Sequence, residues 1–492
     1  MTAHGDLSGR TSRGAVLTLA GNLLVKGLSL LVLLLVARVL DAGAYGLAVL
    51  ALGLFGFAEV MTNPALQTTL LREPHLDDRT VDVACTLNLV RGVAMTTALF
   101  ALAPSIASWW PEQQEVMAGY LRVLSCTFLI QGLQNLHAIR LRRELRFAKA
   151  FLLDSAPTLV GPLFVIAALW SSGEAVWMVA GPPVGAAAGA LVSIAVARPL
   201  PRLRFDSAEA TRLCRFSTPL LISAVMVFIL LHGDDLFVEH TAGFAALGVY
   251  ALSFRWSNAG ILFVVHGLQG ILTPAYLKLR DDPARLRHAV LNSLTVLCSV
   301  SLLIGAMLVA FADELFWLVG GSTAGWQGAA AIARALVPLA MSRGINATLT
   351  PVFLVAGKPH WLTWMTAVQL AAFWPAMVAG SAAFGVVGVA LAVSMLSLGV
   401  SLAKVFAVRP LIGLQPHAIV RAIVPGLLMA STAGTAGWLT TAGIADPGAR
   451  LLVGATTTGI TFLVLWELLC RHRIADRLPQ RSFLAIAGLL GR

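Results

Sequence analysis

Residues 15–38 read AVLTLAGNLLVKGLSLLVLLLVAR, an apolar run that carries one lysine, Lys26, close to its middle. A helix needs about 20 predominantly apolar residues to cross a bilayer. Comparable runs recur almost to the C-terminus of this 492-residue chain, which is 58% hydrophobic and only 12% charged. Inside lipid the backbone must satisfy its own hydrogen bonds, which favours helices. The sequence therefore predicts an all-α, polytopic integral membrane protein.

We expect about fourteen transmembrane helices, each an apolar run bounded by turn-forming residues. Asp41-Ala42-Gly43 separates the first two runs, and Asp446-Pro447-Gly448 separates the last two. The expected spans are residues 15–38, 45–64, 81–106, 116–139, 150–170, 174–197, 217–238, 246–271, 289–311, 328–355, 360–380, 384–407, 418–440 and 449–470.

Basic residues fall in every second gap between these runs. The gap at residues 109–115 has two Glu and no Lys or Arg, whereas the next gap holds Arg140, Arg142, Arg143, Arg146 and Lys149. Cytoplasmic loops carry the excess of Lys and Arg, so both termini of this multi-pass protein are predicted to be cytoplasmic. The net charge of +11 then comes mainly from loops held against anionic membrane lipids. A nucleic-acid partner is not expected, because the bases do not gather on a soluble domain.

Signatures of cofactor and metal chemistry are absent from the sequence. It has no Gly-rich Lys-Ser/Thr phosphate loop, no His-Glu-x-x-His and no dinucleotide fingerprint. The five cysteines are scattered without metal-binding spacing. We expect no cofactor, no metal and no catalytic residues. Transport rather than enzymatic activity is the prediction, with energy from a gradient or from the substrate.

A short motif occurs twice, about 200 residues apart. Residues 38–47 read RVLDAGAYGL and residues 240–250 read HTAGFAALGVY, so that Gly46 aligns with Gly248. Six predicted spans separate the copies. Because that number is even, both halves of the chain share one orientation, as in a parallel repeat about an axis along the membrane normal.

Motifs in a consistent order cover nearly the whole chain. They are Asp41 through Gly46, Pro64-Ala65-Leu66 with Arg72, Asp235 through Gly243, Ala246-Leu247-Gly248 with Tyr250 and Arg255, Gly320-Gly321 with Trp326, Ala356-Gly357-Lys358, and Gly385 through Ala392. In these the chain resembles the polysaccharide-exporter, or oligosaccharide flippase, branch of the multidrug/oligosaccharidyl-lipid/polysaccharide (MOP) transporter superfamily. Ala42 departs from the family pattern, in which Pro or Gly is common at that place.

The resemblance implies a fold like that of the multidrug exporters of the superfamily, with two six-helix bundles facing each other across a central cavity. It also implies flipping of undecaprenyl-pyrophosphate-linked sugars from the cytoplasmic to the periplasmic leaflet. The segments expected on this basis are a cytoplasmic tail (1–13), an N-terminal six-helix lobe (14–200), a C-terminal six-helix lobe (201–410), two extra helices (411–470) and a basic cytoplasmic tail (471–492).

Two predicted spans carry polar stripes that suit a wet cavity. Asn22 and Lys26 share one face of the first span, and Arg255, Asn258 and Gln269 lie within about 80° on the eighth. Ionisable groups at membrane depth are costly and usually face a cavity or a partner. Lys26 and Arg255 are therefore candidates for binding a diphosphate, and the three amides for binding sugar hydroxyls.

Other charges within the spans leave two interpretations open. Arg91 and Arg343 are central in the third and tenth spans and are candidates either for substrate contact or for pairing between helices. Glu59, Asp234 and Asp235 could pair with Lys26 or Arg255, or could couple transport to a proton or cation.

The sequence thus predicts an alternating-access flippase for a lipid-linked oligosaccharide, in a pathway for lipopolysaccharide or exopolysaccharide. A polysaccharide polymerase and a chain-length regulator are the protein partners expected. One alternative is a cation-coupled multidrug exporter of the same superfamily, which would use a buried acid as its ion site. Another is a polytopic glycan polymerase or ligase, which would need a sizeable external loop, whereas the longest polar connection is only about residues 198–217.

Overall fold

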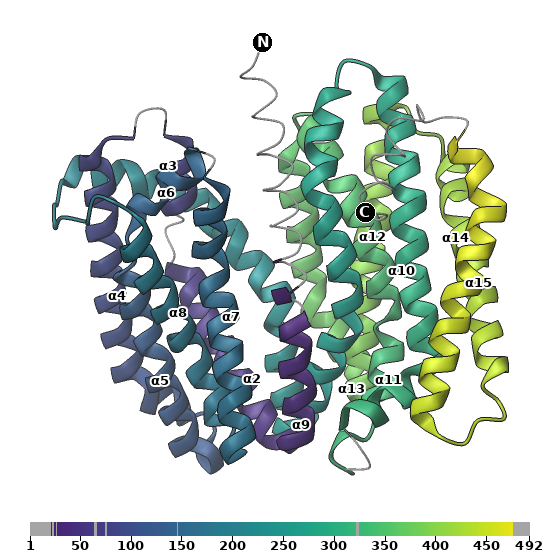
Figure 1. Ribbon diagram of the computed structural model, residues 1–492, viewed down its shortest axis with the longest axis horizontal. Coiled ribbons are helices and arrows are strands. Elements are labelled where there is room, and N and C mark those ends of the chain that lie inside the picture. The colour runs from purple at the N-terminus through teal and green to yellow at the C-terminus, as the bar shows by residue number, and fades with distance from the viewer. Residues whose placement is uncertain are drawn as a thin grey trace. The chain divides into compact units, whose positions relative to one another are not determined.

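The computed structural model describes residues 21–475 except 22–23, 26, 63–65, 74–75, 145 and 321–323, and this part is almost entirely helical (Figure 1). An apolar helix at Gly27–Val39 precedes the labelled elements. The α-helices are α2 (Ala42–Thr62), α3 (Leu66–Arg72), α4 (Asp78–Ala107), α5 (Gln114–Gly132), α6 (Ile139–Arg143), α7 (Phe147–Ser172), α8 (Val176–Val196), α9 (Ser207–Lys278), α10 (Pro283–Gly320), α11 (Ala329–Ala335), α12 (Val337–Val355), α13 (Pro359–Ile412), α14 (Pro416–Thr440) and α15 (Pro447–Ala475). Three short 3₁₀ helices are η1 (Pro111–Gln113), η2 (Leu136–Ala138) and η3 (Ala324–Trp326).

The three longest helices are interrupted. Gly243 has φ 81° within α9, Phe311 leaves the helical region within α10, and Gly385 has φ 58° within α13. Positive φ is readily adopted only by glycine, so Gly243 and Gly385 allow breaks that most residues would resist. Each of α9 and α13 therefore consists of two helical arms.

Nine helices of the described residues are long and apolar enough to cross a membrane, or ten if the bent pair Pro111–Gly132 and Leu136–Arg143 forms one span. The prediction of a helical, multi-pass membrane protein is confirmed. The expected count of fourteen spans stays a prediction.

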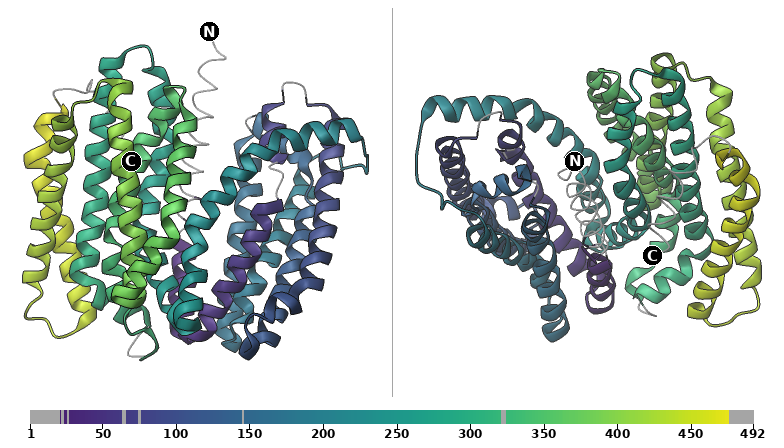
Figure 2. Two further views of the ribbon diagram at one scale, coloured as in Figure 1. Left: turned by 180° about the vertical axis from the view of Figure 1, so that it is seen from behind. Right: turned by 45° about the horizontal axis from the view of Figure 1, so that its top comes forward.

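The chain forms two compact units, unit 1 (Met1–Leu252) and unit 2 (Ser253–Arg492). Unit 1 is built mainly on the packing of α4 with α5, α7 with α8 and α5 with α8. Unit 2 is built on α10 with α14, α12 with α13 and α14 with α15. Within each unit the helices run roughly alongside one another, as the further views show (Figure 2).

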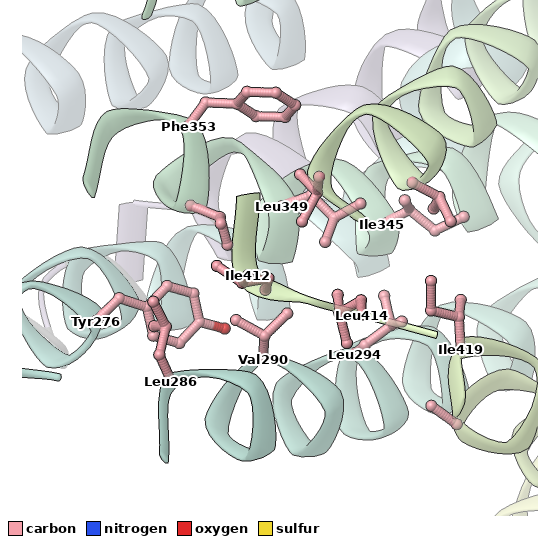
Figure 3. Close-up of a cluster of buried hydrophobic side chains, with 14 of the residues drawn as sticks. Tyr276, Leu286, Val290, Leu294, Ile345, Leu349, Phe353, Ile412, Leu414 and Ile419 are labelled. Atoms are coloured by element: carbon pink, nitrogen blue, oxygen red, sulfur yellow. The ribbon is translucent and has the colours of Figure 1, made fainter. Parts of the chain in front are cut away.

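The hydrophobic core of unit 2 follows helical spacing. Leu286, Val290 and Leu294 lie four residues apart on α10, and they gather with Ile345 and Leu349 of α12 in one buried cluster (Figure 3). Residues at i and i+4 share one face of a helix, so the spacing turns these side chains toward the same neighbour.

Small residues bring the helices of unit 1 into backbone contact. A Cβ added at Gly92 of α4 would lie 2.6 Å from the Phe128 carbonyl oxygen of α5, and one at Gly185 of α8 would lie 2.7 Å from the Pro157 carbonyl oxygen of α7. Helices in lipid associate through close packing at small residues, because lipid tails are as apolar as the side chains they would replace.

The two copies of the repeated motif meet within unit 1. A Cβ at Gly46 would lie 2.0 Å from the Phe244 carbonyl oxygen, and a Cβ at Gly248 would lie 1.9 Å from the Ala42 carbonyl oxygen. Gly46 thus lies against the backbone of Phe244, four residues before Gly248. Gly248 in turn lies against the backbone of Ala42, four residues before Gly46. The contact between the copies is reciprocal.

Some predicted helix boundaries are wrong. The helix predicted to begin at residue 217 begins at Ser207, because the Asp206 carboxylate accepts hydrogen bonds from the backbone N–H groups of Ala208 and Glu209 at 3.0 and 3.3 Å and so caps the first turn.

Two predicted spans are also interrupted. The span predicted at 116–139 ends as a straight helix at Gly132, and the chain bends by 61° before α6. The span predicted at 328–355 is divided at Leu336 into α11 and α12, with a proline in the first turn of α12. A proline lacks the N–H that a continuing helix would need.

Candidate functional site

The stripe predicted on the first span lies outside the described residues, since both Asn22 and Lys26 fall there. Gln269 is in α9, but its side chain is also outside the described part. Arg255 has an exposed side chain on α9, and Asn258 is buried, with its amide donating to the Phe254 carbonyl at 2.7 Å. The diphosphate and sugar roles of these residues stay predictions.

Arg91 on α4 lies in a polar cluster within unit 1. Its Nε donates to Thr62 Oγ1 of α2 at 3.5 Å, and its guanidinium lies 5.8 Å from the centre of the Phe128 ring of α5. A cation over an aromatic face is attracted by the ring quadrupole. One nitrogen of the guanidinium, Nη2, is buried without a hydrogen-bond partner among the described residues.

A carboxylate accompanies this arginine. Gln131 Nε2 of α5 donates to Glu59 Oε1 of α2 at 3.0 Å, and Asn88 Nδ2 of α4 donates to the Gln131 carbonyl at 2.8 Å. Glu59 lies one helical turn before Thr62, the acceptor for Arg91, so the acid and this acceptor share one face of α2. The cluster joins three helices and contains one acid and one base, so its net charge is zero.

Unit 2 contains a chain of hydrogen bonds that ends on a lysine. Lys404 Nζ of α13 donates to Asn346 Oδ1 of α12 at 2.7 Å, and Asn346 Nδ2 donates to Ser401 Oγ at 2.8 Å. The hydroxyls of Ser342 and Ser397 lie 2.9 Å apart beside them. Within the described residues no carboxylate forms an ion pair with Lys404.

Sequence reasoning missed Lys404, although a signal was present. Ser397, Ser401 and Lys404 are spaced by four and three residues, so they share one face of α13. A single lysine at the end of a polar stripe in an apolar run is a candidate for a buried cation.

Arg343 of α12 is a second cation of unit 2. Its side chain is half-buried, and its Nε has no hydrogen-bond partner in the part of the chain that the structure describes. Arg343 and Lys404 thus differ from Arg91, because neither has an acid beside it among these residues.

Two of the three predicted coupling acids, Asp234 and Asp235, lie in α9 before its bend, whereas Glu59 lies in α2. Asp234 is 1% exposed, and its Oδ2 accepts a hydrogen bond from the Tyr250 hydroxyl at 2.5 Å. Its other oxygen, Oδ1, is buried without a partner in the described residues. Asp235 Oδ2 lies 3.4 Å from His232 Nδ1. Of these two acids, Asp234 alone has a buried carboxyl oxygen without a hydrogen-bond partner among the described residues.

Outside the spans, a set of ion pairs ties the start of α9 to the preceding helices of unit 1. Arg79 pairs with Asp206 at 2.6 Å, and Arg212 pairs with both Glu73 and Glu209 at 2.7 and 2.6 Å. The backbone N–H of Glu209, together with Arg79, lowers the pKa of Asp206. The hydrogen bond from Arg212 lowers the pKa of Glu209.

The fold of the described residues is similar to that of solved membrane transporters, one of them a member of the MOP superfamily. The structure is similar to that of the lipid II flippase MurJ in its inward closed conformation, with a TM-score of 0.77 at 14% identity over 93% of this chain and 100% of that chain. It is also similar to an inward-facing multidrug resistance MATE family transporter of the MOP superfamily, with a TM-score of 0.65 at 16% identity over 81% and 98% of the two chains.

A family model described as polysaccharide biosynthesis protein matches residues 35–330, which is more than half of the chain, and the chain belongs to this family. The lipopolysaccharide biosynthesis protein WzxC of Escherichia coli (strain K12) is 20% identical over 83% of each chain. The succinoglycan biosynthesis transport protein ExoT of Rhizobium meliloti (strain 1021) is 24% identical over 76% of this chain and 74% of the relative. The membership predicted from the motifs is confirmed.

Proposed function

We propose that this protein flips an undecaprenyl-pyrophosphate-linked oligosaccharide across the bacterial inner membrane for surface polysaccharide synthesis. Both termini are cytoplasmic in this proposal, and the chain crosses the membrane fourteen times. Two six-helix lobes (14–200 and 201–410) alternate access to the substrate, and helices 13 and 14 (411–470) are additional. The protein acts as a transporter rather than as an enzyme, beside a polymerase and a chain-length regulator.

The observation that carries this proposal is the pair of cations in unit 2 without an acidic partner in the described residues. Both side chains are half-buried within apolar helices, where a charge without compensation is costly, so their presence calls for a counter-charge from a ligand. Guanidinium and ammonium groups donate hydrogen bonds to phosphate oxygens. Arg343 and Lys404 would therefore bind the diphosphate, together with Lys26 and Arg255, whereas Asn22, Asn258 and Gln269 would bind sugar hydroxyls.

The test replaces each cation of unit 2 by a neutral side chain of similar length, as Lys404→Met and Arg343→Met. Loss of one charge-assisted hydrogen bond costs about 1.5–3 kcal/mol, which is a factor of roughly 10 or more in affinity. We expect surface polysaccharide to fall about tenfold in each variant at equal membrane expression, measured by immunoblot of cell extracts.

The matched control is Arg334→Met. Arg334 of α11 is also a basic residue of unit 2, but it pairs with Asp313 at 2.5 Å and both groups are substantially exposed. Because exposed ion pairs contribute little, polysaccharide should stay at the wild-type level. Normal polysaccharide in both Lys404→Met and Arg343→Met would remove these residues from the mechanism.

One observation favours the cation-coupled multidrug exporter as a second candidate. Asp234 is a buried acid with one unpartnered oxygen, which is the kind of group that such an exporter uses to hold a proton or cation. In the flippase the same acid would couple transport to an ion, and Glu59 and Asp235 would serve pairing. Drug susceptibility separates the two functions. Deletion of an exporter sensitises cells to cationic drugs and leaves polysaccharide intact.

A further inference from the structure

A pocket of about 250 Å³ lies within unit 1, at the end of the unit that carries α3 and α6. Its walls come from α3, η2, α6, α7 and α8, and from the segment that follows α5. Pockets for drug-sized ligands measure roughly 300–1,000 Å³, so this one suits a smaller group of about the size of a single sugar ring.

Two side-chain amides of the lining are available for a ligand. Gln67 of α3 and Gln134 after α5 have no side-chain hydrogen bond to the residues that the structure describes. An amide group both donates and accepts hydrogen bonds, which matches a hydroxyl group.

The neighbouring Asn135 is different because its amide is fully occupied. Its Nδ2 donates to the carbonyls of Ala197 and Pro199 at 3.2 and 3.1 Å, and its Oδ1 accepts from the backbone N–H of His137 at 3.0 Å. Asn135 therefore holds the wall in place, and the glutamines face the ligand.

The charges of the pocket cancel. Arg142 of α6 donates to the Asp154 carboxylate of α7, and the two side chains are 36% and 56% exposed. Because one base is matched by one acid, the pocket favours a neutral polar ligand over a phosphate. A carboxylate accepts hydrogen bonds from hydroxyl groups, and a guanidinium donates to hydroxyl oxygens.

The remaining wall is apolar and is shaped by a glycine. Leu153 and Pro157 of α7 line the pocket together with Gly189 of α8. A Cβ at Gly189 would lie 3.5 Å from Gln134 Nε2 and 3.5 Å from the Pro157 side chain, which is ordinary contact distance. An alanine would fit there without backbone strain, but its methyl group would occupy space in the pocket.

We infer that this pocket binds one neutral sugar residue of the substrate's oligosaccharide. The inference rests on the proposed function. Gln67, Gln134 and the Arg142–Asp154 pair bind the ring hydroxyls, and the CH face of the ring packs against Leu153 and Pro157. The sugar site belongs to unit 1 and differs in charge from the cations of unit 2. Recognition of the sugar is therefore separate from recognition of the diphosphate.

The test uses saturation-transfer NMR on the full-length protein in detergent micelles. The probes are the methyl glycosides of glucose, galactose and mannose. Wild-type protein should transfer saturation to at least one of them. Loss of one hydrogen bond costs about 1 kcal/mol, so Gln134→Leu should weaken binding about fivefold. Gly189→Ala should weaken binding to a similar degree and preserves the backbone.

The matched control is Gly119→Ala in α5. A Cβ at this glycine would have nothing within 4 Å, so the substitution should leave binding unchanged. The inference is overturned if no glycoside receives saturation in the wild type, or if all variants bind equally. A phospholipid as the occupant would also overturn it. In that case native mass spectrometry would find a phospholipid bound to the wild type and lost from Gln134→Leu, and no glycoside would bind.

The binding assay does not require transport. Its outcome is therefore independent of whether the proposed function is correct. Lys404→Met should still bind the glycoside. Normal polysaccharide in Lys404→Met together with glycoside binding would contradict the proposed role of the cations and retain the pocket. Reduced polysaccharide in Lys404→Met together with no glycoside binding would contradict the sugar site and retain the proposed role of the cations.

Discussion

The polar clusters of the two units solve the problem of a cation at membrane depth in different ways. In unit 1, Arg91 is accompanied by Glu59, and Gln131 and Asn88 link the helices around them. In unit 2, the neutral amide of Asn346 is the hydrogen-bond partner of Lys404 among the residues that the structure describes. Breaking a buried pair is strongly destabilising, whereas an uncompensated buried charge is itself a cost. In the function proposed above, the cluster of unit 1 therefore serves stability and that of unit 2 binds an anion.

The largest effect is expected from removing the acid of unit 1. Glu59→Leu should leave Arg91 without compensation and Gln131 Nε2 without its acceptor, which we expect to cost about 2–3 kcal/mol. The measurement is thermal unfolding of the purified protein in detergent.

A second substitution checks this interpretation. Glu59→Leu with Arg91→Met removes both charges, so most of the lost stability should return. If Glu59→Leu alone is as stable as the wild type, the acid of unit 1 does not compensate Arg91, and the contrast between the units fails.

In unit 2, a smaller effect is expected from changing the serine that positions Asn346. Ser401→Ala removes the hydroxyl that accepts from Asn346 Nδ2, at a cost of about 1 kcal/mol. The amide can then turn, so Lys404 loses a fixed partner and polysaccharide output should fall with little loss of protein. Ser431→Ala on α14 is the control, since Ser431 is exposed and its hydroxyl bonds, among the described residues, within its own helix. Equal output from both variants would show that the position of Asn346 is unimportant.

The smallest effect concerns pH and the ion pairs at the start of α9 in unit 1. The pKa values of Asp206 and Glu209 are lowered in the folded protein. Their contribution to stability is therefore present above their unfolded pKa values of about 4 and is lost as pH falls below them. Asp206→Asn should flatten the decline of the unfolding temperature between about pH 5 and pH 3. An unchanged decline would mean that other carboxylates govern it.

The sequence was sufficient for the fold class, because apolar runs of span length have few alternatives to a membrane helix. It was weaker at helix ends. The start of α9 was placed at residue 217 because residues 198–217 are polar, although Asp206 followed by Glu209 is typical of a helix N-terminus. A polar first turn extends beyond the membrane, so hydropathy does not detect it.

For the site, the sequence identified single residues and not their partners. Arg91 and Glu59 were both singled out, but Gln131 lies in another predicted span, and its position beside them depends on how α2, α4 and α5 pack. Lys404 was missed because it lies near the end of its predicted span, where basic side chains commonly reach the surface. Its burial follows from the contact of α13 with α12.

The reciprocal glycine contact in unit 1 has a consequence for the origin of the fold. Gly46 lies on the carbonyl of Phe244, and Gly248 lies on that of Ala42. This is the pattern of an isologous interface, in which residue i of one subunit contacts j of the other and j contacts i. The two motif copies therefore meet as two identical polypeptides would in a symmetric dimer. Such a contact favours an ancestor in which a half-length chain paired with itself before its gene was duplicated and fused.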